Sequence, residues 1–420
     1  MPLKVVHFAD VHLGSENYGQ LDPQTGLSTR LTDFVHSIDT IVDVALDEAA
    51  DLVVFGGDAY KTRDPSPTYQ REFARRIRRL SQAGVPTVLV AGNHDMPNAV
   101  GRAHTMEIYR TLEVEHVYVA RSPAVFDIDT AHGPVQVGVL PWIVRSNLLS
   151  RDDYRNCSLE EVNDLLLERI ELILTGEGGL TSRLREDVPH ILVVHGTVQG
   201  ATYGSERTVM LGQDVVLPLQ LLKQPSWDYV ALGHIHQHQA IEPERAPPVV
   251  YSGSVERIDF GEEKEDKGFV LAEVARGACS WTFRKLEVRP FLTVRVTADG
   301  DDPTAQILAA LERAPLEGAV VRLIVRTTAD RDVLIRENEV RRALDPAFYV
   351  AAILHDVVRP ERMRLGAQED VAGLTPLEAL ERYLKVKETP PDRARLLMHH
   401  AELLVITQEN PYRTEEQHAL

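Results

Sequence analysis

Cysteine is nearly absent from this chain of 420 residues, which contains only Cys157 and Cys279. A disulfide framework and a thiolate zinc site both need several cysteines at short, regular spacings. The sequence therefore excludes both, and any bound metal ion must be held by nitrogen and oxygen atoms.

Long apolar runs are missing as well. No stretch approaches the roughly 18 uninterrupted apolar residues of a membrane-spanning helix, and the first residues, MPLKVVHFADVH, lack a signal-peptide pattern. We therefore expect a cytoplasmic protein that does not associate with membranes.

Positive charge is in deficit, because the formal net charge is −18. This argues against nonspecific binding of nucleic acid over the whole surface, but a local basic surface stays open. The segment PTYQREFARRIRRL predicts a helix with a buried stripe of Phe73, Ile77 and Leu80. Its arginines form either a solvated face or a phosphate-contacting one: Arg71, Arg75, Arg78 and Arg79.

The order of apolar segments predicts the fold class. Strand-like runs alternate with amphipathic helical ones, which is typical of an α/β protein, here a layered α/β/α sandwich. A chain of this length exceeds one hydrophobic core. We expect a large domain over residues 1–288, a small α/β module over 289–364, and a linker with two helices over 365–420. In the module, RDVLIRENEVRRAL is predicted to form one helix.

Five predicted strands end directly before polar residues. These strands lie in KVVHFADVH, DLVVFGGDAY, VPTVLVAGNHD, PHILVVHGT and WDYVALGHIH. Each polar group taken singly could be a helix cap, a turn or a solvated histidine. Their recurrence at the ends of strands, which converge at one edge of a sheet, favours a dinuclear metal site. The residues concerned are Asp10, His12, Asp58, Asn93, His94, Asp95, His195, His234 and His236.

Asp58 is the best candidate for a ligand shared by both ions. Dinuclear sites need a carboxylate that reaches two ions about 3.5–4 Å apart, and the small Gly56 and Gly57 allow a close approach. Histidine, carboxylate and amide ligands without thiolate suit two Mn²⁺ ions, with Fe²⁺ or Zn²⁺ as alternatives and Mg²⁺ a poorer match. His7, inside the first strand, is expected to pack, and His238, beyond the end of its strand, is not expected to bind metal.

The motifs DVH, GGD, GNHD, VVHG and GHIH, in this order, resemble those of the calcineurin-like metallophosphoesterases. The stretch VVYSGSVERIDFGEEKEDKGFVLAEV is similar to the SbcD-type nuclease subunits of DNA double-strand-break repair. The resemblance implies that one ion is bound by Asp10, His12, Asp58 and His236. It implies that the other is bound by Asp58, Asn93, His195 and His234.

The same resemblance implies roles for the residues beside the ligands. His94 would steady the scissile phosphate and protonate the leaving oxygen, and Asp95 would orient the ring of His94. Lys61 and Arg63, in AYKTRDP, are candidates for substrate contacts. Many relatives carry an acidic residue or histidine near the position of Lys61, so this part of substrate recognition departs from the family pattern.

The C-terminal third is expected to contact DNA and partner proteins. By resemblance, the small module caps the active site and helps admit DNA, and the last helices bind an SbcC-like ATPase within a homodimer. Thr375 and Glu378 have capping-box spacing around Pro376. Two apolar stripes follow: Leu377, Leu380 and Leu384, then Leu397, Ala401 and Leu404. The alternative to partner binding is that these two helices dock onto the rest of the chain. Because no glycine loop ends in GK[ST], ATP use would belong to the partner.

Three functions follow as hypotheses. The first is a Mn²⁺-dependent DNA nuclease, a 3′ to 5′ exonuclease on duplex ends and an endonuclease on single strands or hairpins. The second is a phosphodiesterase for small molecules such as cyclic nucleotides, against which the long C-terminal extension argues. The third is a scaffold that regulates the ATPase, against which the complete set of converging, mutually repelling ligands argues.

Overall fold

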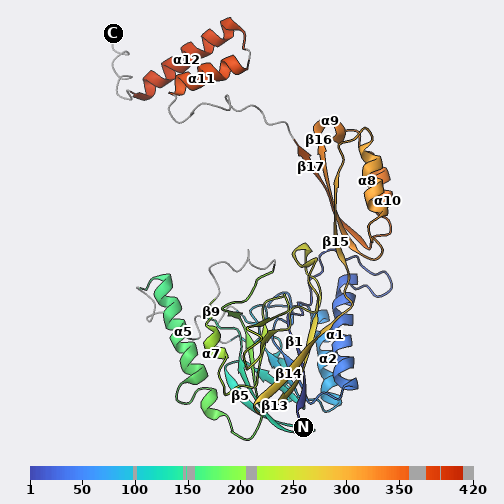
Figure 1. The fold of residues 1–420 in the computed structure, drawn as a ribbon, viewed down its shortest axis with the longest axis vertical. Coiled ribbons are helices and arrows are strands. Elements are labelled where there is room, and N and C mark those ends of the chain that lie inside the picture. The colour runs from blue at the N-terminus through green and yellow to red at the C-terminus, as the bar shows by residue number, and fades with distance from the viewer. Residues whose placement is uncertain are drawn as a thin grey trace.

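The computed structural model describes residues 1–97, 102–144, 148, 157–204, 215–358, 375–387 and 389–409. Within these residues, none of the helices combines the length and the apolar character needed to cross a membrane. Two six-stranded sheets form the main body (Figure 1).

The first sheet has the order β14-β13-β1-β2-β3-β4. Its parallel part is formed by β1 (Leu3–Phe8), β2 (Leu52–Phe55), β3 (Thr87–Val90) and β4 (Val117–Ala120). Two antiparallel strands, β13 (Gly268–Ala275) and β14 (Ala278–Lys285), close one side. The helices that connect the parallel strands are α1 (Thr29–Asp47), α2 (Pro67–Gln82) and the short α3 (Glu107–Thr111).

The second sheet has the order β11-β12-β10-β7-β6-β5. Its central strands are parallel: β6 (Gly133–Leu140), β7 (His190–His195), β10 (Tyr229–Gly233) and β12 (Val249–Tyr251). The outer strands β5 (Ala124–Thr130) and β11 (Gln239–Ile241) are antiparallel to their neighbours. The remaining elements of this half are α5 (Leu159–Thr175), η1 (Thr181–Arg183), β8 (Thr197–Val198), β9 (Val216–Leu217) and α7 (Leu219–Leu222).

The central strands are buried on both faces, so alternate side chains enter different cores. Val5 and Val54 point to a core between the two sheets, which also contains Val137 and Val193. On the outer faces, α1 and α2 pack on the first sheet, and α5 and α7 pack on the second. Figure 1 shows these helix pairs on opposite flanks of the sheets.

The layers are therefore α/β/β/α. The expected mixed α/β class is correct, but the expectation of a single sheet in an α/β/α sandwich is wrong. The five predicted strands divide between two sheets, because a core of apolar side chains covers the inner face of each sheet.

The arginine-rich segment forms α2, and its predicted stripe of Phe73, Ile77 and Leu80 is buried. Arg71 and Arg75 pair with Glu72, and Arg79 pairs with Asp39 and Asp43 of α1. Because these arginines already form ion pairs, a solvated helix face is favoured over a phosphate-contacting one.

A small module follows the first sheet. It has a parallel sheet of β15 (Phe291–Thr297), β16 (Val320–Thr328) and β17 (Tyr349–Val358). Its helices are α8 (Pro303–Glu312), α9 (Ala329–Asp332) and α10 (Glu337–Ala343), so the single helix expected near Arg331 is two short ones. A turn, η2 (Phe260–Glu262), lies between the main body and this module in contact with β15.

The last two helices are α11 (Pro376–Val386) and α12 (Pro391–Glu409), which contact each other. Thr375 and Glu378 form the predicted capping box, with Pro376 in the first turn. Leu384 is buried, whereas Leu397 and Leu404 of the second predicted stripe are exposed. Figure 1 shows this helix pair apart from the other elements.

Candidate metal centre

The residues after five strands meet where the two sheets come together. Asp10 and His12 follow β1, Asp58 follows β2, Asn93 and His94 follow β3, and His195 ends β7. His234 follows β10 directly, so the strand does not continue through the histidines. The sheets are joined here, because Nδ1 of His195 donates to the carbonyl oxygen of Gly56 at 2.7 Å.

Strained backbone marks the same positions. Asp10, His12, Asp58 and His234 have φ angles of 52°, 50°, 59° and 102°. Side-chain-bearing residues rarely adopt such angles, and they concentrate where a function requires them. The loops are thus held in a conformation that presents these side chains inward.

The first cluster contains Asp10, His12 and His236, all buried, with ligand atoms within 4.8 Å of one another. Nε2 of His12 lies 3.0 Å from Nε2 of His236. Both carboxylate oxygens of Asp10 accept from the backbone N–H of His234 at 3.0 Å, which fixes this side chain.

The second cluster contains Asp58, His195 and His234. The side-chain oxygen of Asn93 lies 3.0 Å from Nε2 of His195 and 3.0 Å from Nδ1 of His234. Trp142 packs against His234 with a ring-centroid distance of 5.0 Å and so covers one side of the cluster.

Asp58 lies between the two clusters. Its Oδ2 atom is 3.6 Å from Nε2 of His12 and 3.5 Å from Nε2 of His195. Its Oδ1 atom accepts from the backbone N–H of His94 at 2.8 Å. One carboxylate therefore faces both groups of histidines, which is the arrangement that a bridging ligand needs.

One glycine makes room for this carboxylate, and another makes room for His195. A Cβ atom on Gly92 would lie 2.1 Å from Oδ1 of Asp58, and one on Gly57 would lie 2.3 Å from Nδ1 of His195. Neither position can carry a side chain without moving a predicted ligand.

His94 is oriented by a backbone group. Its Nδ1 donates to the carbonyl oxygen of Lys61 at 2.8 Å, which leaves Nε2 as the ring atom that can contact a substrate. The prediction that Asp95 orients this ring is wrong. The carboxylate of Asp95 is buried and accepts from the backbone N–H groups of Asp58, Ala59 and Gly92 at 2.8–3.3 Å. Asp95 therefore holds the two loops together.

Negative charge is crowded in the centre. Burial raises the pKa of Asp10 to about 7, and burial together with the charge of Asp58 raises the pKa of Asp95 to about 7. Burial alone would lower the pKa of His195, but Asp58 and Asp10 raise it to about 9. Closely spaced carboxylates favour a positively charged neighbour, as the raised pKa of His195 indicates. The same environment suits bound cations.

Glu262 is a residue that the sequence analysis missed. Its Oε1 atom lies 2.7 Å from Nδ1 of His236, and its side chain is buried. Lys267 forms an ion pair with it at 2.8 Å. In the sequence, Glu262 lies in the SbcD-like stretch, within the acidic run IDFGEEKED, and such a run normally indicates an exposed segment.

His7 and His238 have partners outside the clusters. His7 is buried in β1, where its ring lies 2.9 Å from the hydroxyl of Tyr229 and 3.1 Å from the carbonyl oxygen of Leu232. His238 stacks on Phe283 with a centroid distance of 3.9 Å. His7 therefore packs as expected, and neither histidine belongs to a metal-ligand cluster of the described residues.

The candidate substrate residues lie beside the centre. Lys61 and Arg63 are both exposed, and Nε of Arg63 donates to the carbonyl oxygen of Met96 at 2.7 Å.

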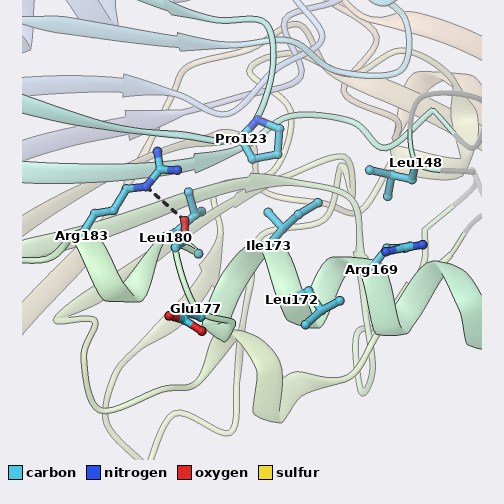
Figure 2. A pocket seen from close by; sticks show the side chains of 10 residues that line it. Pro123, Leu148, Arg169, Leu172, Ile173, Glu177, Leu180 and Arg183 are labelled. Atoms are coloured by element: carbon cyan, nitrogen blue, oxygen red, sulfur yellow. Dashed lines mark hydrogen bonds between the residues drawn. The ribbon is translucent and has the colours of Figure 1, made fainter.

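A separate cavity of about 400 Å³ lies against α5, and Figure 2 shows Leu172 and Ile173 of this helix among its lining residues. Its described lining contains no predicted metal ligand, so it is not part of the centre.

The sequence model of the calcineurin-like phosphoesterases matches residues 3–238. The chain belongs to this family. The prediction made from the five motifs is thereby confirmed, and the matched range contains both clusters of this phosphoesterase.

Relatives extend the similarity beyond the phosphoesterase region. The chain is 27% identical to the SbcD subunit of the nuclease SbcCD from Rhodobacter capsulatus, over 90% of this chain and 93% of that protein. It is 27% identical to the corresponding SbcD subunit from Bacillus subtilis, over 66% of this chain and 67% of that protein. A dimetal phosphatase from Danio rerio is 13% identical, with a TM-score of 0.39 over 67% of this chain and 99% of that chain.

The donor set of this phosphoesterase fits two divalent ions. Asp10, His12 and His236 offer oxygen and nitrogen atoms to one ion, and His195 and His234 offer nitrogen atoms to the other. Asp58 reaches both groups. The third group of metal-ligand type contains His12, Asp58 and His94, which places His94 beside the shared carboxylate.

Proposed function

We propose that this phosphoesterase is a Mn²⁺-dependent DNA nuclease. Its activities would be 3′ to 5′ exonuclease on duplex ends and endonuclease on single strands or hairpins. It would act as an SbcD-like subunit in double-strand-break repair.

The position of Asp58 between the two clusters carries the enzymatic part of this proposal. A carboxylate that faces two sets of buried histidines fits a dinuclear hydrolase, and a scaffold has no need of it. The DNA substrate is supported by the similarity to nuclease subunits, one of which is matched over 90% of this chain.

Each predicted residue then has a place in the reaction. Asp10, His12, Asp58 and His236 would hold one ion, and Asp58, Asn93, His195 and His234 the other. Bound Mn²⁺ would activate water and polarise the phosphodiester. Fe²⁺ and Zn²⁺ fit the same donors, and Mg²⁺ fits them less well.

His94 would act on the substrate directly. Because its Nδ1 donates to the Lys61 carbonyl, Nε2 is the atom that would face the phosphate. With protons on both ring nitrogens, His94 would steady the phosphate through Nε2 and give that proton to the leaving 3′ or 5′ oxygen. Lys61 and Arg63 would contact neighbouring phosphates.

Other parts of the chain would contact DNA and partner proteins. The small module, for which we propose residues 289–364, would cap the active site and help admit DNA. Its second boundary lies outside the residues that the structure describes. Exposed Leu396 and Leu397 of α12 support docking of α11 and α12 on an SbcC-like ATPase. Exposed Ile108 and Leu112 at α3 support a homodimer.

One assay separates this proposal from its alternatives. The purified chain is incubated with Mn²⁺ and labelled duplex DNA, hairpin DNA or a cyclic nucleotide. Cleavage of DNA is expected. Cleavage of the cyclic nucleotide alone would favour a small-molecule phosphodiesterase, and no cleavage with two bound ions would favour a scaffold. The Asp58→Ala variant serves as the control for contaminating nucleases.

A further inference from the structure

The turn η2 lies between the metal centre and the module of β15 to β17. On one side, Oε1 of Glu262 lies 2.7 Å from Nδ1 of His236. The other ring nitrogen of His236, Nε2, lies in the cluster with Asp10 and His12. Glu262 of η2, which is not itself a predicted ligand, therefore contacts the predicted ligand His236.

The contact selects the form of the imidazole that can bind a metal ion. A carboxylate accepts hydrogen bonds, so it favours the tautomer with the proton on Nδ1 and the lone pair on Nε2. Nε2 is the atom that points into the cluster. Glu262 thus orients the ring and keeps its ligand atom available.

The carboxylate of Glu262 is itself held in place. Its Oε2 atom accepts from Nζ of Lys267 at 2.8 Å and from the backbone N–H of Ile258 at 3.0 Å. Glu262 and Lys267 are each only 1% exposed. Burying an ion pair costs desolvation energy, and such pairs add little net stability. The orientation of His236 gives this buried pair a function.

The opposite side of η2 contacts the small module. Glu263, the residue after the turn, accepts from the backbone N–H and the hydroxyl of Thr293 in β15 at 2.8 and 2.6 Å. Arg322 of β16 donates to the same hydroxyl at 3.0 Å and lies over the ring of Phe260 at 4.3 Å. Phe260 also packs edge-on against Phe291. The module therefore fixes the turn that carries Glu262.

We propose that Glu262 is a positioning residue for His236, and that η2 links the placement of the β15–β17 module to the affinity of one metal site. The proposal rests on the proposed metal centre but does not require that DNA is the substrate. It adds a way in which a substrate or partner that shifts the module would change metal occupancy.

The first experiment measures Mn²⁺ binding to metal-free protein by calorimetry and by electron paramagnetic resonance. Glu262→Gln keeps the size of the side chain but removes its charge. We expect two ions in the wild type and a 10- to 100-fold loss of affinity at one site in the variant, as for other partners of metal-binding histidines. Glu256→Gln is the matched control, because Glu256 is equally buried and bonds to the Arg257 backbone instead.

The second experiment changes the module side of the turn. Arg322→Gln and Thr293→Val should each weaken the same site several-fold, and combining either with Glu262→Gln should add little, because His236 is then already released. Arg326→Gln, an exposed position on the same strand as Arg322, is the control. Circular dichroism and thermal melting establish that every variant is folded.

The outcomes separate the proposal from the metal centre on which it rests. Wild-type protein that binds no Mn²⁺ would overturn the centre itself. Two ions bound equally well by the wild type and Glu262→Gln would overturn the positioning role. A weakened site in Glu262→Gln with unchanged affinity in Arg322→Gln and Thr293→Val would overturn the link to the module.

Discussion

The carbonyl oxygen of Lys61 accepts a hydrogen bond from Nδ1 of His94 at 2.8 Å. A main-chain group therefore orients the predicted catalytic histidine, so the identity of the side chain at position 61 does not affect this contact. The departure from the family pattern at Lys61 leaves the orientation of His94 intact and concerns substrate contacts alone.

The side chain of Lys61 should therefore affect binding more than chemistry. We expect Lys61→Ala to raise KM for DNA a few-fold, most at low salt, with kcat nearly unchanged. Steady-state kinetics at two salt concentrations measure this. A large fall in kcat with unchanged KM would place Lys61 in the chemical step.

His94 and His236 should respond differently to added metal. His94→Ala should keep both ions and lose roughly 10²- to 10⁴-fold in cleavage, the usual contribution of a positioned acid. His236→Ala should lose one ion, and excess Mn²⁺ should partly restore its activity. Activity measured against Mn²⁺ concentration distinguishes them. Rescue of His94→Ala by metal would make His94 a ligand.

Asp58 should be required for both ions. Because its Oδ2 atom faces His12 and His195 at similar distances, Asp58→Ala removes a ligand from each cluster. We expect loss of both metals and of all nuclease activity. Elemental analysis after gel filtration measures metal content, and two ions per chain in this variant would show that Asp58 is not the bridge.

Glu256 should make the stability of the protein depend on pH. Burial raises the pKa of Glu256 from its ordinary value of 4.5 to about 7. Because the folded protein holds this proton more tightly than the unfolded chain, ionisation favours unfolding. The wild type should lose stability relative to Glu256→Gln as the pH rises from about 4.5 to about 7. Thermal melts of both proteins from pH 4 to pH 8 measure the difference, and a constant difference would contradict this origin.

The last two helices should be dispensable for catalysis but not for partnership. A chain ending at residue 370 lacks α11 and α12, which contact each other. It should retain Mn²⁺-dependent cleavage of single-stranded DNA but fail to co-purify with an SbcC-like ATPase. Undiminished co-purification would exclude these helices as the docking site.

Local sequence patterns were enough to place five strands and the polar residues that follow them. In β1, β2, β3, β7 and β10, the apolar run and the polar residue after it are neighbours in the chain. The capping box at Thr375 was predictable for the same reason, since residues three apart interact within one helical turn.

The arrangement of these strands and residues could not be predicted from local patterns. The strands divide between two sheets, because pairing depends on contacts between distant segments such as β1 with β13. Asp95 binds backbone N–H groups 36 and 37 residues away, and the backbone of Lys61 binds His94, 33 residues away. Backbone groups carry no residue-specific signal. Glu262 and Lys267 resemble surface charges in the sequence, and they become a support for His236 only because the chain folds around them.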